Sequence, residues 1–336
     1  MGPLLEIRDL SVTFPVARRG AWPWAQPDQL QAVSKASLTL GKGDILGLVG
    51  ESGSGKSTLA RAIVGTVRAS EGEVLWKGRD LRAITPAEAR AQGRHVQMVF
   101  QDPLAALNPR MTVGQVVAEP LITHFPDLSK SEIRHRVGAM MERVGLLPSL
   151  VNRYPHEFSG GQCQRIGIAR ALVTEPELVV CDEPVSALDV SVQAQVVNLL
   201  RDLQSDMGLS LLFIAHDLAV VRHISTRIAV MYLGRIVEMA PAAELIGNPR
   251  HPYTKALIAS VPIPSPEAEH ARQRPVLKGE LPSPLSPPSG CVFRTRCPIA
   301  RPACAAARPS LAEIADDHVV ACPFHSETGP VEPALS

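Results

Sequence analysis

The chain has 336 residues and a formal net charge of +1, with 45% hydrophobic and 4% aromatic residues. This length suffices for one large domain with a buried core and a smaller appendage. The near-neutral charge gives no electrostatic reason to expect nucleic acid as a partner. Residues 1–10 contain Glu6, Arg8 and Asp9 and no apolar run, and no apolar stretch approaches the roughly 18 to 20 residues that cross a bilayer. We therefore expect a cytosolic protein whose membrane role, if it has one, depends on partner subunits.

The N-terminal part is predicted to form an antiparallel β layer. Residues 4–15 alternate loosely between apolar and polar side chains, and residues 38–40 form a short apolar run before a Gly-Lys-Gly-Asp turn. Residues 45–49 then form an apolar strand, a glycine-rich turn follows, and residues 56–67 have the apolar spacing of a helix. The order of strand, glycine-rich turn and helix is typical of a phosphate-binding loop.

The glycine-rich turn matches the phosphate-loop pattern G-x-x-x-x-G-K-S. In this pattern the glycines let backbone N–H groups close around a β-phosphate, Lys56 reaches the β- and γ-phosphate oxygens, and Ser57 binds Mg²⁺. The residues assigned here to ATP binding are Gly50, Glu51, Ser52, Gly53, Ser54, Gly55, Lys56, Ser57 and Thr58. The alternative is a chance glycine-rich turn, which the position between strand and helix disfavours.

Two continuous apolar runs, at residues 178–181 and 211–215, predict parallel strands that are covered on both faces. The first run ends in two acids. Asp182 can hold the Mg²⁺ shell, and Glu183 is placed to orient and deprotonate the water that attacks a phosphoryl group. The alternative is a pair of solvated acids at a strand end. Between the phosphate loop and these strands, residues of about 102–171 have a mostly helical pattern and are interpreted as an inserted helical subdomain.

A second glycine-containing segment, Ser159-Gly160-Gly161-Gln162, opens a helical pattern that continues to Leu172. It offers a hydroxyl, uncovered backbone N–H groups and the positive end of a helix dipole, all of which favour an anion such as a γ-phosphate. We expect this segment to lie far from the phosphate loop of its own chain. A complete site would then need two chains, which indicates an ATP-driven dimer.

Together these motifs resemble the nucleotide-binding subunits of ATP-binding-cassette (ABC) transporters. The matching segments occur in family order at residues 50–57, 100–103, 158–162, 181–184, 186–189 and 215–217, with Phe158 where the family usually has Leu. The resemblance implies an α/β fold with a P-loop NTPase core of the RecA-like type, the antiparallel β layer and the helical subdomain. Residues 1–250 would form this nucleotide-binding domain.

The same resemblance implies roles for residues outside the phosphate loop. Gln101 would contact Mg²⁺ and the attacking water, and His216 would contact the γ-phosphate beside the catalytic Glu183. Asp189 would communicate across the dimer, and Ser159 to Gln162 would cap the ATP of the opposing subunit. Phe14 would stack on adenine, with Trp22 and Trp24 of the following loop as competing candidates.

A narrower resemblance is to the oligopeptide/dipeptide importer branch of this family. It rests on residues 108–114, 184–191, 248–254, 282–284 and 290–291. It implies a heterodimer with a paralogous ATPase, two permease subunits, an extracytoplasmic solute-binding protein and a place on the cytoplasmic face of the cell membrane. Residues 107–110 look most like the second ATPase type. The cargo implied is a peptide, with nickel, glutathione and antibiotic peptides left open.

The C-terminal extension, residues 251–336, combines a proline-rich linker with a cysteine-rich module. The His-Pro-Tyr sequence at residues 251–253 is interpreted as a rigid turn that joins core to tail without chemistry, with a chemical role as the alternative. Four of the six cysteines lie further on, at Cys291, Cys297, Cys304 and Cys322. The resemblance implies a [4Fe-4S] cluster, zinc is disfavoured because close Cys-x-x-Cys pairs are lacking, and unligated thiols remain the third alternative. We expect this module to lie apart from the phosphate loop and to affect assembly more than hydrolysis.

Two other functions fit the phosphate loop alone. Soluble ABC ATPases of DNA repair or chromosome organisation insert long coiled coils between the two glycine motifs, whereas residues 101–159 contain no heptad run. A phosphate-loop kinase would have no use for Ser159 to Gln162, and a test for phosphate transfer to a small acceptor would separate it from an ATPase.

Overall fold

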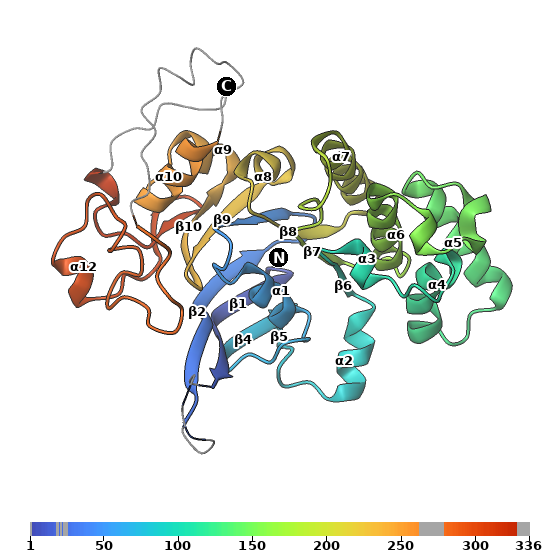
Figure 1. Ribbon diagram of the computed structural model, residues 1–336, viewed down its shortest axis with the longest axis horizontal. Coiled ribbons are helices and arrows are strands. Elements are labelled where there is room, and N and C mark those ends of the chain that lie inside the picture. The colour runs from blue at the N-terminus through green and yellow to red at the C-terminus, as the bar shows by residue number, and fades with distance from the viewer. Residues whose placement is uncertain (1, 18–19, 21, 23–25, 262–278, 328–336) are drawn as a thin grey trace, which may run out of the picture.

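The computed structural model describes residues 2–17, 20, 22, 26–261 and 279–327. An eight-stranded sheet runs through the middle of the molecule (Figure 1). From one edge to the other its strands are β11 (Ala312–Ala315), β12 (His318–Val320), β10 (Arg235–Pro241), β9 (Arg227–Tyr232), β3 (Ile45–Val49), β8 (Ser210–Ala215), β7 (Leu178–Asp182) and β6 (Val96–Val99). The five strands β9, β3, β8, β7 and β6 run parallel to one another. The remaining neighbours, β9 with β10, β10 with β12 and β12 with β11, are antiparallel.

The central strands are buried on both faces, as their apolar runs predict. Because successive side chains in a strand point to opposite faces, Leu178 and Val180 join one hydrophobic core while Val179 and Cys181 join the other. Each face of the sheet must therefore be covered by other elements.

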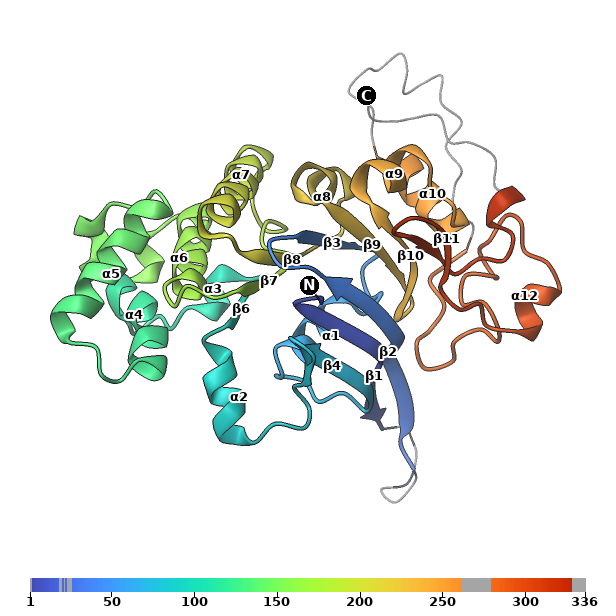
Figure 2. The ribbon, with the colours of Figure 1, turned by 180° about the vertical axis from the view of Figure 1, so that it is seen from behind.

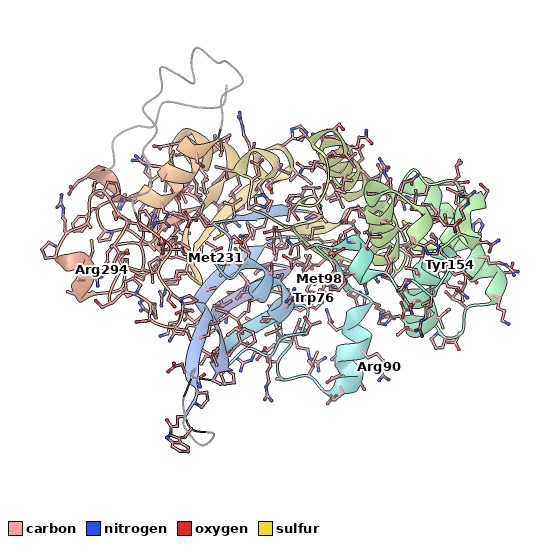
Figure 3. The ribbon with its side chains drawn as sticks, in the orientation of Figure 1. Trp76, Arg90, Met98, Tyr154, Met231 and Arg294 are labelled. Atoms are coloured by element: carbon pink, nitrogen blue, oxygen red, sulfur yellow. The ribbon has the colours of Figure 1, made fainter. Side chains whose placement is uncertain are left out.

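One face is covered by a four-stranded antiparallel sheet and by helix α1 (Lys56–Ile63) (Figure 1). The strands of this second sheet are β2 (Asp28–Leu40), β1 (Leu5–Val16), β4 (Glu71–Trp76) and β5 (Arg79–Asp80). Trp76, Met98 and Met231 lie in the core between the two sheets (Figure 3). The predicted antiparallel layer is confirmed.

Helices α7 (Val190–Met207), α8 (Leu218–Ile224), α9 (Ala242–Gly247) and α10 (Pro252–Ser260) lie on the side of the main sheet away from the antiparallel layer (Figure 2). Beyond the β6 edge the chain forms a group of helices, seen at the right of Figure 1. Between β5 and β7 the helices, in chain order, are α2 (Pro86–Gly93), α3 (Pro103–Ala106), α4 (Val113–His124), α5 (Lys130–Arg143) and α6 (Gly160–Leu172). Two 3-10 turns, at Pro148–Asn152 and Pro155–Glu157, lie between α5 and α6. Tyr154 lies on this group, at the end of the molecule opposite Arg294 (Figure 3).

Residues 279–327 do not form the independent module expected from their sequence. Strand β12 pairs with β10, with Val319 opposite Met239, so the tail extends the main sheet. Val292 and Phe293 are buried in the same core as α7 and α8. A segment too small to fold by itself thus uses apolar surface and a strand edge of the larger domain. The remaining tail elements are α12 (Ala303–Ala306) and a 3-10 turn at His325–Glu327.

The first part of the proline-rich linker, residues 262–278, lies outside the described residues. Among the residues that the structure does describe, no helix combines the length and the apolar character that a membrane span requires.

Candidate ATP-binding site

The phosphate loop follows β3 and leads into α1, as predicted. Gly55 precedes the helix with a φ of 102°, and a Cβ at this position would lie 2.2 Å from the carbonyl oxygen of Ala32. Both the backbone conformation and the close approach require glycine. The helix ends at Ile63 and not near Val67, because the chain turns at Gly65 with a φ of 78°.

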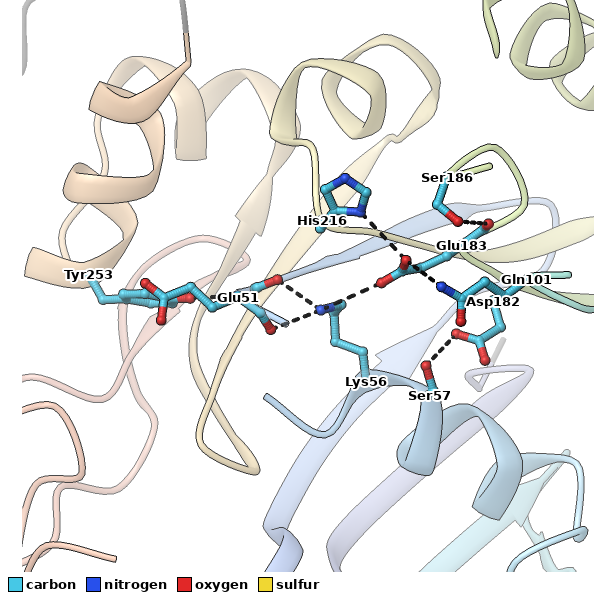
Figure 4. Close-up of polar contacts among 10 residues, drawn as sticks. Glu51, Lys56, Ser57, Gln101, Asp182, Glu183, Ser186, His216 and Tyr253 are labelled. Atoms are coloured by element: carbon cyan, nitrogen blue, oxygen red, sulfur yellow. Dashed lines mark hydrogen bonds and ion pairs between the residues drawn. The ribbon is translucent and has the colours of Figure 1, made fainter. Parts of the chain in front are cut away.

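Lys56 is buried at the centre of the loop, with its side chain 4% exposed. Its ammonium donates to the carbonyl oxygens of Gly50 at 2.8 Å and Glu51 at 3.1 Å (Figure 4). Burial lowers the pKa of Lys56, while the carboxylates of Glu183, Asp182 and Glu51 oppose this shift. The ammonium is therefore held in place before any phosphate arrives.

Glu183 is the meeting point of the predicted catalytic side chains. Its carboxylate accepts a hydrogen bond from Gln101 Nε2 at 3.1 Å, lies 3.5 Å from His216 Nδ1 and lies 4.0 Å from Lys56 Nζ (Figure 4). The backbone of Glu183 has a φ of 47°, a strained conformation for a residue with a side chain. Ser186 Oγ donates to the Glu183 carbonyl at 3.1 Å and supports the turn.

Local turns after β6 and β8 bring two of these side chains to Glu183. Asp102 caps α3 by accepting from two backbone N–H groups, so the chain turns immediately after Gln101. Asp217 caps α8 by accepting from the backbone N–H of Ala219, immediately after His216. Because β6, β7 and β8 are parallel neighbours, their carboxyl ends meet at one edge of the sheet. Gln101, Glu183 and His216 all come from that edge.

The predicted Mg²⁺ residues are also adjacent. Ser57 Oγ donates to Asp182 Oδ1 at 2.8 Å (Figure 4). Burial raises the pKa of Asp182, and the Ser57 hydrogen bond partly opposes this shift. A hydroxyl and a carboxylate at hydrogen-bond distance are oxygen ligands of the kind that Mg²⁺ takes in nucleotide sites. With Gln101 nearby on Glu183, these oxygen groups fit a magnesium ion, which Ser57, Asp182 and Gln101 would hold.

The second glycine motif lies at the surface. Ser159 caps α6 and forms a capping box with Gln162, and both residues are exposed. Gly161 packs against α7, where a Cβ would come within 2.5 Å of Val192. Asp189 immediately precedes α7 and is exposed. Among the described residues, no hydrogen bond or ion pair connects this motif to the phosphate loop.

Two of the aromatic residues predicted near adenine are described, and both are exposed. Phe14 lies on β1 and is 37% exposed, and Trp22 is 70% exposed. Trp24 lies outside the described residues. The stacking role of Phe14 stays a prediction.

Two residues beside the phosphate loop were missed by the sequence analysis. Tyr253 Oη accepts the backbone N–H of Glu51 at 2.8 Å, and Arg296 binds the Glu51 carboxylate with both of its terminal nitrogens. The interpretation of residues 251–253 as a turn without chemistry is therefore wrong in part: His251 caps α10, and Tyr253 reaches the loop. The expected separation between tail and phosphate loop is also wrong. No local pattern signals either contact.

The four tail cysteines line one small cavity of about 20 Å³ together with His251 and Phe293. Burial raises the pKa of Cys291, Cys297 and Cys322, and for Cys297 the value is about 11. Within the described ranges, no group of three or more Cys, His, Asp or Glu side chains is arranged to hold a metal ion. The four predicted cysteine ligands therefore surround one cavity, but they are not arranged to bind a metal ion. The cavity is no larger than a single water molecule needs.

A phosphate loop after β3, an acid pair at the carboxyl end of β7 and a Ser-Gly-Gly helix start define an ATP-binding cassette. Comparison with known proteins agrees. Residues 33–186 match the family model described as ABC transporter, and residues 237–304 match the one described as Oligopeptide/dipeptide transporter, C-terminal region. The chain belongs to the ATP-binding subunits of ABC transporters, and it is an ATPase of that family.

Individual relatives cover almost the whole chain. The oligopeptide transport ATP-binding protein OppF of Salmonella typhimurium is 61% identical over 319 residues, which are 95% of each chain. The oligopeptide transport ATP-binding protein AppF of Bacillus subtilis is 51% identical over 324 residues, covering 96% of this chain and 98% of that one. A dimeric, post-hydrolysis structure of the ATP-binding cassette MJ0796 with ADP and Pi superposes with a TM-score of 0.62 at 27% identity, covering 71% of this chain and 98% of that one.

Proposed function

We propose that this chain is one of two ATPase subunits of a membrane importer of di- and oligopeptides. The observation that carries the proposal is the end-to-end similarity to oligopeptide transport ATP-binding proteins, together with an intact site around Glu183. Importers of nickel, glutathione or antibiotic peptides remain the alternatives for the cargo.

The partner ATPase in this proposal is a paralogous subunit, so that the dimer is a heterodimer. The exposed Ser159 and Gly160 at the start of α6 would cap ATP on the partner's phosphate loop. The dimeric MJ0796 cassette is a precedent for two such chains facing each other. Each ATP would then be held between two chains, and closure of the dimer would depend on ATP.

Two permease subunits would bind the dimer on the cytoplasmic face of the membrane, and a solute-binding protein would deliver cargo from the other side. A groove of about 730 Å³ beside the site is lined in part by Phe100, Gln101 and Pro120, and Phe100 is 41% exposed. A permease segment in this groove would contact Gln101 directly, and Gln101 in turn contacts Glu183. Transport and hydrolysis would be coupled through that contact.

In this mechanism Glu183 orients the attacking water and accepts its proton, while Gln101 and His216 position the carboxylate and the reacting phosphate. Lys56 neutralises charge on the β- and γ-phosphates. Ser57, Asp182 and Gln101 would hold Mg²⁺, which supplies electrostatic stabilisation of charge on the phosphate oxygens.

Reconstitution tests the cargo. The chain, its partner ATPase and the two permeases in lipid vesicles should hydrolyse ATP several-fold faster when the binding protein is added with an oligopeptide. Nickel ions, glutathione and an antibiotic peptide are offered in parallel. Stimulation by one of these and not by the oligopeptide would assign the importer to that cargo, and stimulation by none would contradict the import function.

We also propose that Cys291, Cys297, Cys304 and Cys322 hold a [4Fe-4S] cluster, with zinc as the alternative. The support is the convergence of four thiols on one cavity in a tail with little core of its own. Burial raises the pKa of Cys291, Cys297 and Cys322, so these three thiols need a metal to lose their protons at neutral pH. The cavity would have to widen to admit four irons.

Anaerobically purified protein should then be brown, with about four irons per chain. Cys297→Ser should lose iron and colour, whereas Cys163→Ser should keep both because Cys163 lies in the main core and not at this cavity. One equivalent of zinc without iron would shift the assignment to zinc. Four freely titratable thiols and no metal in the native protein would refute a metal site.

A further inference from the structure

The first side chain of the phosphate loop is an acid, although the loop binds a polyanion. An ionised carboxylate at Glu51 repels nucleotide phosphates unless its charge is balanced. The charge of Glu51 affects the site. Burial, the largest effect, lowers the pKa of Lys56, and the Glu51 carboxylate is one of the groups that raise it. A balancing cation is therefore needed next to Glu51.

That cation comes from the tail. Arg296 Nη1 lies 2.7 Å from Glu51 Oε2, and Arg296 Nη2 lies 3.1 Å from Glu51 Oε1. The Arg296 side chain is 8% exposed and the Glu51 side chain 26%, so the pair is largely shielded from water. Two parallel N–H···O bonds fix both the charge and the direction of a carboxylate.

The position of Arg296 is set by a buried aromatic cluster. The Arg296 guanidinium lies 5.9 Å from the centroid of the Tyr232 ring. The rings of Tyr232, Tyr253 and Phe293 pack against one another, with centroids 4.7 to 5.4 Å apart. Tyr253, from the same cluster, accepts the backbone N–H of Glu51. The cluster thus holds both the side chain and the backbone of the loop's first acidic residue (Figure 4 shows the Tyr253 contact).

Arg296 also lies in the turn that carries two of the cavity cysteines. Arg294 N–H donates to the Cys291 carbonyl, and Arg296 N–H donates to the Phe293 carbonyl, which makes residues 291–297 one compact turn. One side of the turn faces the thiol cavity through Cys291, Phe293 and Cys297. The other side presents Arg296 to the phosphate loop.

We propose that Arg296 is a positioning residue of the ATP site, which neutralises Glu51 and holds it away from the nucleotide phosphates. The C-terminal tail is then a part of the nucleotide site and not only an assembly module. The inference rests on the ATPase function of the chain and not on its cargo.

Arg296→Ala leaves Glu51 unpaired, so the dissociation constant of MgATP for the full-length chain should rise about tenfold. In the assembled transporter the KM for ATP should rise while kcat stays within about twofold, because the groups that contact Glu183 are unchanged. Arg308→Ala is the matched control: Arg308 is an exposed arginine of the tail whose side chain donates to Gly290 and does not contact the loop.

Charge rescue separates positioning from a merely structural role. Glu51→Gln combined with Arg296→Ala removes both charges, and MgATP affinity should return to within about threefold of the unchanged chain. An Arg296→Ala chain with unaltered affinity, or a double variant as weak as Arg296→Ala alone, would overturn the proposal. If Arg296→Ala does not fold, Arg296→Gln with and without Glu51→Gln is measured against the same criteria. Failure of the unchanged chain to bind MgATP would count against the ATPase function instead.

Discussion

Glu183→Gln is expected to abolish steady-state ATP turnover, with a loss of about 10²- to 10⁴-fold, while ATP binding is kept. The glutamine amide can still accept the hydrogen bond that Gln101 donates to Glu183, so the arrangement at the end of β7 survives. It cannot accept a proton from water. The substituted chain should therefore accumulate as an ATP-bound dimer with its partner, detectable by size-exclusion chromatography with MgATP.

This measurement needs a partner whose own catalytic acid is also replaced, because the second site could otherwise supply all the turnover. Glu142→Gln is the control, since Glu142 is an exposed acid on α5 and has no contact with the site. Turnover near that of the unchanged transporter in the doubly substituted dimer would show that Glu183 is not the base.

Lys56→Ala is expected to act one step earlier and to weaken ATP binding itself. The Lys56 ammonium is held inside the loop by two backbone carbonyl oxygens, so it is the cation placed to bind the negative charge of an entering phosphate. Loss of a charge-assisted contact with phosphate corresponds to a rise in the dissociation constant of at least about tenfold. Hydrolysis should fall further, because the same charge stabilises the transition state.

Equilibrium titration of the full-length chain with MgATP measures this loss. Lys42→Ala is the control, because Lys42 is an exposed lysine in the turn before β3 and has no part in the loop. Equal ATP affinity for Lys56→Ala and Lys42→Ala would exclude a phosphate-binding role for Lys56.

The contact of the tail with the phosphate loop gives the cysteine cavity a route to the nucleotide. Phe293 lines the cavity and packs on Tyr253, and Tyr253 binds the backbone of Glu51. Any change at the cavity that moves residues 291–297 would move Arg296 as well. ATP affinity is therefore worth measuring beside iron content in the cysteine variants.

Local sequence determined the parts of this protein whose chemistry needs consecutive residues. The phosphate loop could be predicted because Gly55 and Lys56 act through backbone and side chain within one turn, and the order of strand and helix around them is also local. The central strands β7 and β8 could be predicted because burial on both faces demands an unbroken apolar run. The cap at Ser159 likewise depends only on residues up to Gln162.

Tertiary structure alone decided which distant groups meet. Arg296 binds a carboxylate 245 positions earlier in the chain, and Tyr253 binds a backbone N–H 202 positions earlier. Neither contact leaves a local pattern, because an ion pair or a hydrogen bond requires only that two complementary groups be brought together by the surrounding fold. The tail was likewise predicted as a separate module because its composition shows a small core, whereas its stability comes from pairing with β10 and from apolar surface of the main domain, which only the assembled sheet presents.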